Sequence, residues 1–100
     1  MLYMVVERYI HGPGPVYERA AANGRMLPEG LRYLDSWVVD DSAMDRCFQL
    51  METDDPTLFD EWTDRWRDLV EVEIVPVIGS AAAASRVYQH VPAERGDTPT

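Results

Sequence analysis

The fold is decided by residues 46–77, which read RCFQLMETDDPTLFDEWTDRWRDLVEVEIVPV. Within this stretch, large apolar side chains recur at spacings of three, four and three residues: Phe59, Trp62, Trp66 and Leu69. This spacing is typical of one face of an amphipathic helix, and it predicts that the face packs in the core. Asp55 and Pro56 precede it and fit the N-cap and the first position of a helix.

Strands are predicted on both sides of this helix. The segment 44–52, MDRCFQLME, precedes it, and the segment 70–78, VEVEIVPVI, alternates before it becomes continuously apolar. Pro76 lacks a backbone N–H, so this last strand is expected at an edge of its sheet or near a strand end. The deciding stretch is therefore a strand, a helix and a second strand.

The N-terminal half predicts the same order of elements. The segment 2–10, LYMVVERYI, is rich in β-branched and aromatic residues and is expected to form a strand. A short helix is predicted over 15–23, beginning at Pro15 and ending before Gly24. The segment 31–39, LRYLDSWVV, is the next predicted strand.

The complete order is β-α-β-β-α-β, which is an α+β, ferredoxin-like arrangement. It predicts a four-stranded antiparallel sheet with both helices on one face. We expect this domain to cover residues 1–81. Residues 82–100 are expected to hold a short C-terminal helix followed by a disordered tail.

Strand alternation assigns side chains to the two faces of the predicted sheet. Pairing Trp37 with Cys47 places one aliphatic set under the helices: Leu2, Met4, Val6, Leu34, Val38, Phe48 and Leu50. The opposite face then carries a larger and more aromatic set: Tyr3, Val5, Glu7, Tyr9, Tyr33, Asp35, Trp37, Cys47, Gln49 and Met51. A register shift of one residue would invert this assignment.

An apolar face of this size is more than a soluble monomer usually exposes. We therefore expect a homodimer, formed through the sheet faces, that encloses an aromatic cavity suited to a small organic ligand. The expected lining of this cavity is the following set: Tyr3, Tyr9, Tyr33, Trp37, Cys47, Gln49 and Met51.

Composition excludes several classes of partner. Asp and Glu number 18 against nine arginines and no lysine, which gives a net charge of −9 over 100 residues. Such a chain repels nucleic-acid phosphates and anionic membrane surfaces, so we expect neither as a partner. A single cysteine forms no internal disulfide, and the N-terminal segment lacks the pattern of a signal peptide. We expect a cytoplasmic protein without a membrane span.

Four residues are candidates for chemistry. Glu7 and Asp35 fall in the expected cavity, where apolar surroundings raise a carboxyl pKa and favour acid–base catalysis. His11 follows the first strand beside a Gly/Pro-rich loop and is a candidate general base. Cys47 is a possible nucleophile, although a cysteine in mid-strand is more often a small buried hydrophobe. Hydrogen-bonded, structural roles for the two acids and an exposed loop position for His11 are the favoured alternatives.

No cofactor or metal is expected. Two distant histidines and one cysteine form no ligand cluster, and the acidic turn at 39–45 lacks the pattern of a calcium-binding loop. His11 is the one arguable axial ligand for a haem.

Three stretches, 1–9, 15–38 and 46–77, resemble a small bacterial family, domain of unknown function 3303. The string CFQLMETDD and the pair Trp62 and Trp66 carry most of this resemblance, which covers residues 1–81. The acidic turn at 39–45 is longer than the pattern of the family. The resemblance implies a dimeric α/β barrel of the ferredoxin-like superfamily. That superfamily includes cofactor-free monooxygenases, haem-degrading enzymes, lactone isomerases and plain ligand-binding modules, so the fold does not choose the activity.

Three functions remain open at this point. The first is a homodimeric protein that binds a small organic ligand in its aromatic cavity. The second is a cofactor-independent isomerase or monooxygenase-like enzyme that uses the cavity carboxylates. The third is an assembly module whose sheet face binds only another protein surface. An enclosed cavity with convergent polar groups favours the first two, and a filled face favours the third.

Overall fold

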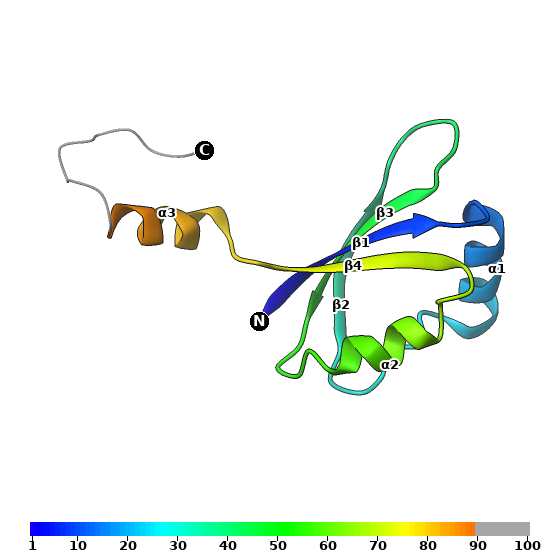
Figure 1. The fold of residues 1–100 in the computed structure, drawn as a ribbon, viewed down its shortest axis with the longest axis horizontal. Helices are drawn as coiled ribbons and strands as arrows, with labels where there is room; N and C mark the ends of the chain where they lie inside the picture. The colour runs from blue at the N-terminus through cyan, green and yellow to red at the C-terminus, as the bar shows by residue number, and fades with distance from the viewer. Residues whose placement is uncertain (90–100) are drawn as a thin grey trace.

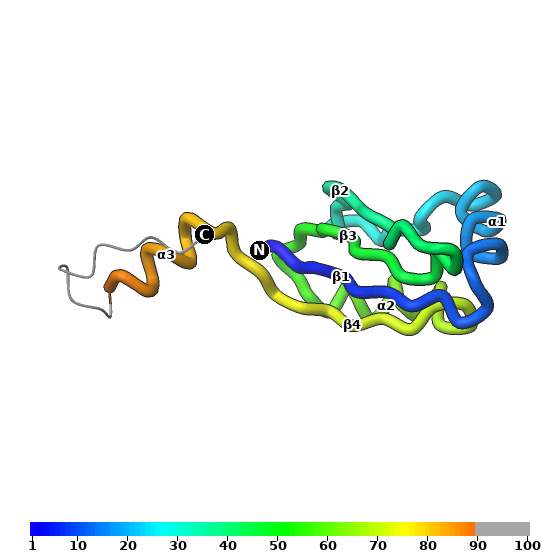
Figure 2. Tube along the Cα trace, turned by 90° about the horizontal axis from the view of Figure 1, so that it is seen from above, coloured from blue at the N-terminus to red at the C-terminus, as the bar shows by residue number. Residues whose placement is uncertain are grey.

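The computed structural model of the chain describes residues 1–89, and it confirms the α+β class and the predicted order of elements. The elements are β1 (Leu2–Tyr9), α1 (Pro13–Asn23), β2 (Arg32–Val38), β3 (Arg46–Glu52), α2 (Leu58–Asp64), β4 (Val70–Val77) and α3 (Ser80–Tyr88). The strands form one antiparallel sheet in the order β2-β3-β1-β4, as Figures 1 and 2 show from two directions. β4 is therefore an edge strand, which is where Pro76 was expected.

Both of the first two helices begin at a different residue from the one predicted. α1 starts at Pro13 rather than Pro15, and both prolines lie in its first turn, where the N–H groups need no helical partner. α2 starts at Leu58 and is only seven residues long. Asp55 still organises its start, because its carboxylate accepts hydrogen bonds from the N–H and the hydroxyl of Thr57.

On the two central strands, β1 and β3, the side chains predicted to lie under the helices lie on the opposite face of the sheet. The helices cover the face that carries Tyr3, Val5 and Glu7 on β1 and the face that carries Cys47 and Met51 on β3, and all of these are buried. The aliphatic residues expected there lie on the opposite, uncovered face: Leu2, Met4, Val6, Phe48 and Leu50.

The predicted register of the hairpin is also wrong by one residue. Val38, not Trp37, pairs with Cys47, and a β-bulge between Tyr33 and Asp35 shifts the pairing within β2. The bulge changes the face on which each later residue of β2 lies. Tyr33 and Val38 consequently pack against the core.

The same bulge decides the remaining β2 assignments. Asp35 and Trp37 lie on the uncovered face, as predicted, and the side chain of Trp37 is 50% exposed. Leu34, which was expected under the helices, is 45% exposed at the bulge.

The core lies between the helices and the covered face of the sheet. Phe59 and Trp62 of α2 are buried there together with Val16 of α1 and with Trp66. The predicted apolar side chains therefore pack in the core, but α2 ends at Asp64, so Trp66 and Leu69 lie in the turns after the helix and not on it. The ring of Phe59 packs edge-on against Tyr3, with ring centroids 5.1 Å apart. Burial of these aromatic side chains is the main source of stability for so small a domain.

α3 lies apart from the sheet and from the other helices (Figures 1 and 2), and none of its residues is buried. The helix predicted after residue 82 therefore exists, and it begins at Ser80. The predicted disordered tail falls on residues 90–100, outside the described residues. Among the described helices, none has the length and the apolar composition needed to cross a membrane.

Candidate functional site

A pocket of about 280 Å³ lies between the covered face of the sheet and the two helices. Its walls are largely apolar: Val16, Ala20, Val38, Trp62, Trp66 and Val70. Its polar groups come from β1, β3, β2 and the loop after α1: Glu7, Tyr9, Cys47, Gln49, Ser36 and Arg25. An apolar pocket with a few convergent polar groups is the usual form of a small-molecule site.

Three polar side chains form a chain of hydrogen bonds along this pocket. Arg25 Nε donates to Gln49 Oε1 over 3.3 Å, and Gln49 Nε2 donates to Glu7 Oε1 over 2.9 Å. These two bonds fix the orientation of the Gln49 amide, since its oxygen faces the guanidinium and its nitrogen faces the carboxyl. A cationic group near the surface is thereby connected to a carboxyl group that is only 4% exposed.

The carboxyl group of Glu7 is shifted toward its protonated form. Burial raises the pKa of Glu7, because the protein replaces the water that would solvate its charge. Hydrogen bonds with Gln49 and Cys47 and the nearby charge of Arg25 oppose this rise without cancelling it. Glu7 is therefore a buried group that can hold or release a proton nearer to neutral pH than an exposed glutamate.

Tyr9 and Cys47 stand beside Glu7 and are held in their neutral forms. Burial is the largest cause of the raised pKa of the Tyr9 hydroxyl. Burial also raises the pKa of the Cys47 thiol to about 11, although a hydrogen bond with Tyr9 opposes the rise. A thiol with this pKa is a poor nucleophile at neutral pH, because the thiolate is the reactive form. The geometry thus favours the structural interpretation of Cys47.

The loop that carries Arg25 is anchored by the two tryptophans of the helix face. Trp62 Nε1 and Trp66 Nε1 donate to the Arg25 carbonyl oxygen over 2.9 and 3.0 Å. Trp62 lies in α2 and Trp66 in the turns directly after it, and both indoles reach the same acceptor. This arrangement gives each indole a function besides burial, since it fixes the backbone at the entrance of the pocket.

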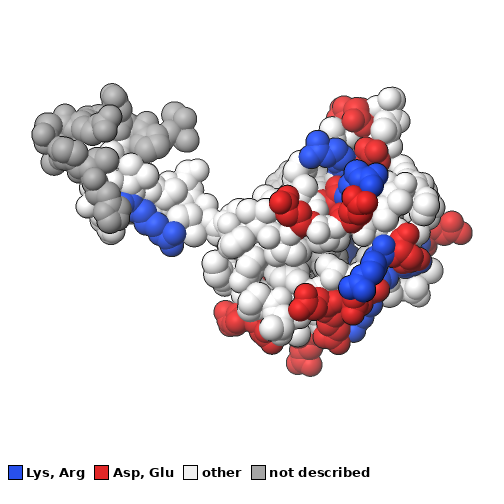
Figure 3. Space-filling view, viewed as in Figure 1, with Lys and Arg blue, Asp and Glu red and all other residues white. Residues whose placement is uncertain are grey.

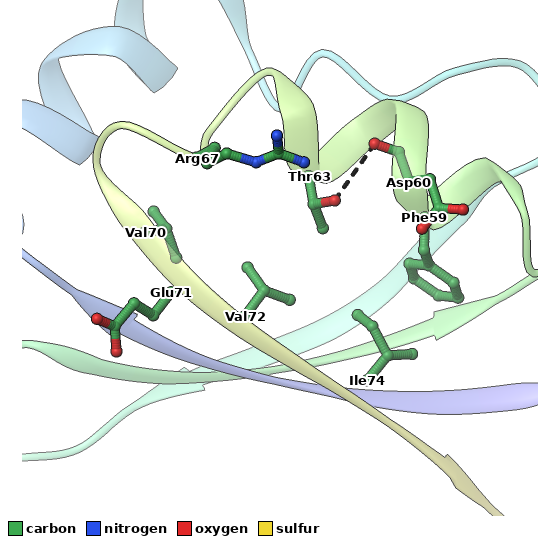
Figure 4. Close-up of a pocket in the computed structure, with 8 residues that line it drawn as sticks. All are labelled: Phe59, Asp60, Thr63, Arg67, Val70, Glu71, Val72 and Ile74. Carbon is green, nitrogen blue, oxygen red and sulfur yellow. Dashed lines mark hydrogen bonds between the residues drawn. The ribbon is translucent and has the colours of Figure 1, made fainter.

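A second hollow, of about 450 Å³, lies between α2 and the free edge of β4, and Figure 4 shows the side chains around it. Phe59, Val72 and Ile74 form its apolar part, and the Thr63 hydroxyl donates to the Asp60 carbonyl oxygen over 3.3 Å. Arg67 at its margin forms an ion pair with Asp64. The buried groups with raised pKa values, Glu7, Tyr9 and Cys47, line the first pocket, which makes that pocket the stronger candidate site.

A family model described as "Domain of unknown function (DUF3303)" matches residues 1–91 of the chain. The chain belongs to this family. The match includes every residue of the pocket and extends beyond the expected limit at residue 81. No curated protein and no solved structure matches the chain.

Of the three predicted acid–base residues, only Glu7 lies in the pocket of this DUF3303 chain. Asp35 is exposed on the uncovered face, where its carboxylate accepts a hydrogen bond from the Ser36 N–H. His11 is exposed just after β1 and does not line the pocket. No group of three or more potential ligands that could hold a metal ion occurs among residues 1–89.

The predicted pocket lining divides in a similar way. Tyr9, Cys47 and Gln49 line the pocket, and Tyr33 contacts it through Arg25, whose Cζ lies 3.5 Å from the tyrosine ring centroid. Tyr3 and Met51 are core residues outside the lining, and Trp37 lies on the other face. The pocket of the single chain lies beneath the helices, and a cavity between two copies of the sheet stays a prediction.

Arg25 is the residue that sequence reasoning missed. It follows a predicted helix end at Gly24, in a segment without a regular pattern, so nothing in its local sequence indicates a site. Gly24 and Met26 both have positive φ angles, of 68° and 57°. The available signal was the glycine, because a left-handed turn after a helix redirects the next side chain.

The raised pKa of Glu7 predicts a specific dependence of stability on pH. Between the ordinary glutamate value of 4.5 and its own folded-state pKa, the folded chain binds more protons at Glu7 than the unfolded chain does. The contribution of Glu7 to the free energy of unfolding must therefore fall as pH rises through this interval. Glu7→Gln, which does not titrate, should gain stability relative to the wild type as the pH rises from 4.5 toward neutrality.

Urea unfolding of both proteins across this range tests the expectation, because the other carboxylates titrate in both and cancel in the difference. Glu29→Gln, at an exposed glutamate in the loop before β2, is the matched control and should show little change with pH. A stability difference for Glu7→Gln that is flat or falls with rising pH would contradict the assignment.

Proposed function

We propose that the chain binds a small organic molecule in the pocket between the sheet and the helices. The observation that carries this proposal is the buried carboxyl group of Glu7, hydrogen-bonded to Gln49 at the base of a pocket with tryptophan walls. A carboxyl group that only stabilised the fold would be better replaced by an apolar side chain, since its burial costs free energy. Its presence is accounted for by a ligand that uses its hydrogen-bonding capacity.

A second candidate function is acid–base catalysis without a cofactor, of the isomerase or monooxygenase kind. The raised pKa of Glu7 favours it, because such a carboxyl can take a proton from one carbon of a bound molecule and return it to another. Tyr9 and Gln49 supply further hydrogen-bonding groups for a carbonyl oxygen. Binding is the first requirement of both functions, so it is tested first.

The three tryptophans of the chain provide the measurement. Each gives one indole N–H signal in a ¹H–¹⁵N NMR spectrum; Trp62 and Trp66 line the pocket, and Trp37 lies on the opposite face. Three probes that share a naphthalene ring are titrated into the protein: 2-naphthoate, 2-naphthalenemethanol and 2-(aminomethyl)naphthalene. Binding in the pocket should shift the signals of Trp62 and Trp66 and leave that of Trp37 unchanged. The proposal fails if none of the probes does so.

A pocket-filling variant makes this test specific. Ala20 lines the pocket from α1, and the adjacent Ala21 is exposed on the same helix. A phenylalanine at position 20 fits into the existing space, so Ala20→Phe should reduce probe affinity at least about tenfold while the protein remains folded. Ala21→Phe adds the same ring outside the pocket and should leave affinity unchanged. Equal effects of the two substitutions would mean that the probes bind elsewhere.

We also propose that two copies of the chain associate through the uncovered face of the sheet, as members of the dimeric α/β-barrel superfamily would. This face is apolar along its centre: Leu2, Met4, Val6, Phe48, Leu50 and Val75. Charged side chains of both signs lie at its margins, with Arg46 on β3 and Glu73 on β4. A two-fold axis can therefore place opposite charges together around an apolar centre.

Much of the acidic charge of the chain lies away from the uncovered face. Acidic side chains gather along the lower edge of the body over α2, and uncharged surface surrounds the point where α3 leaves it (Figure 3). Two ion pairs on the uncovered face, Arg8 with Glu71 and Arg32 with Glu52, are formed within the chain.

The free and buried thiol of Cys47 agrees with a reducing compartment, and we propose that the protein is located in the cytoplasm.

A further inference from the structure

The guanidinium group of Arg25 is held at the pocket with part of its hydrogen-bonding capacity unused. Its Nε donates to Gln49, and its flat face lies over the ring of Tyr33 with Cζ 3.5 Å from the centroid. Within residues 1–89, neither terminal nitrogen of this group has a hydrogen bond or an ion pair. Stacking and the Nε bond orient the plane of the group, and the two Nη atoms are left for another partner.

The backbone at Arg25 and Met26 is held by hydrogen bonds from three side chains. The Arg25 carbonyl oxygen accepts from both Trp62 and Trp66. The next residue, Met26, has a φ of 57°, which an L-residue adopts at a cost unless its surroundings hold it there. Arg65 Nη1 donates to the Met26 carbonyl oxygen over 2.5 Å and supplies that constraint. Five side chains thus determine where the guanidinium of Arg25 lies: Gln49, Tyr33, Trp62, Trp66 and Arg65.

We propose that Arg25 binds the anionic head group of the pocket's ligand, and that the ligand is a small organic acid with a flat, apolar body. This inference rests on the proposed function, since it names the class of molecule that occupies the same pocket. The two Nη atoms fit the two oxygens of a carboxylate, which is the pairing that a planar guanidinium forms best. The indoles of Trp62 and Trp66 would flank the apolar body.

The electrostatics of the pocket agree with an anionic ligand. Among the lining residues that the structure describes, Glu7 is the only acidic one, and burial favours its neutral form. Arg25 is the one cationic residue in the same set. The net charge of −9 repels anions at long range, but screening limits that repulsion beyond about 8–10 Å, whereas the contact with Arg25 is direct. The positive charge of Arg25 in the pocket therefore favours an anionic ligand more than the net charge of the chain disfavours it.

The experiment compares two of the naphthalene probes that differ only in the head group. The anion 2-naphthoate and the neutral 2-naphthalenemethanol are titrated separately, with the indole N–H signals of Trp62 and Trp66 as the readout. We expect the acid to bind about tenfold to a hundredfold more tightly than the alcohol. Arg25→Met should remove this preference and leave the affinity for the alcohol nearly unchanged.

Two further variants separate a ligand contact from a structural role or a general effect of charge. Arg67→Met removes the same charge from the rim of the other hollow and should leave the preference for the acid intact. Arg25→Lys keeps the charge without the planar pair of donors, so its preference should be intermediate. Because the tryptophans bond to the main-chain oxygen of residue 25, their signals also report whether the loop is intact in each variant.

The outcomes distinguish this inference from the proposed function. If acid and alcohol bind in the pocket with equal affinity, the ligand class is wrong and the pocket function stands. If 2-(aminomethyl)naphthalene binds more tightly than the acid, the sign of the charge is wrong. If none of the three moves the signals of Trp62 and Trp66, the proposed function itself fails. A preference for the acid that survives in Arg25→Met would show that another group holds the anion.

Discussion

Trp62→Ala should lower the free energy of unfolding by about 3–5 kcal/mol, the largest effect we expect from any single substitution in the chain. The Trp62 side chain is 2% exposed and lies at the centre of the core between α2 and the sheet. Its removal leaves a cavity that the surrounding rings cannot fill, and it also removes one donor from the Arg25 carbonyl oxygen. The total free energy of unfolding of a typical domain is only about 5–15 kcal/mol, so this loss is a large part of it.

The loss can be divided into packing and hydrogen bonding. Trp62→Phe retains much of the apolar volume but has no indole N–H, so it should cost less than Trp62→Ala. It should still weaken the anchor of the Arg25 loop, which Trp66 then holds alone. We expect Trp62→Phe to reduce the preference of the pocket for 2-naphthoate, because Arg25 loses part of its fixed position.

Urea unfolding followed by circular dichroism measures these differences. Trp37→Ala is the control, because Trp37 is half-exposed on the other face of the sheet and should cost well under half as much in the monomer. Equal losses at positions 37 and 62 would mean that the core does not lie where the structure places it.

The helix face around Trp62 was predictable because its signal is local. Apolar side chains at helical spacing indicate a helix and the side that is buried, although the helix itself ends at Asp64, before Trp66 and Leu69. The order of the elements followed from similar local patterns, with Gly and Pro between them. The elements are confirmed, with ends that differ by a few residues.

The faces of the sheet were not predictable in the same way, because β1 is apolar on both sides. Met4 and Val6 on one face are as hydrophobic as Tyr3 and Val5 on the other, so alternation alone does not say which set meets the helices. The aliphatic set was expected under the helices, and Glu7 was therefore assigned to the opposite face. In the structure its partner Gln49 is buried with it, and burial of a charged residue type is a property that only tertiary contacts reveal.

The bulge in β2 concealed the rest of the candidate site. Counting residues along a regular strand puts Val38 and Tyr33 on opposite sides, whereas the extra residue brings both to the core. Arg25 lay in an irregular loop and is brought to Gln49, 24 residues away, by the anchoring tryptophans. The site was therefore predictable in its residue types on β1 and β3, and not in the groups that loops contribute.

Leu50→Lys should convert the proposed dimer into a monomer, raising its dissociation constant by at least about a hundredfold. Leu50 lies on β3, one of the two central strands, on the uncovered face and opposite Met4 of β1. A two-fold interface would bury two copies of the new ammonium group in an apolar centre without a partner. In the monomer the same side chain can extend into water, so the fold should be retained.

Lysine is the informative substitution because it makes the net charge less negative than −9. A dimer lost in this variant is therefore not lost to general repulsion between acidic chains, which the change reduces. Met44→Lys makes the same chemical change at an exposed turn between β2 and β3 and should leave the association intact. Sedimentation velocity separates a particle of 11.4 kDa from one of twice that mass. If the wild-type chain sediments as a monomer at micromolar concentration, or if Leu50→Lys remains dimeric, the uncovered face is not the interface.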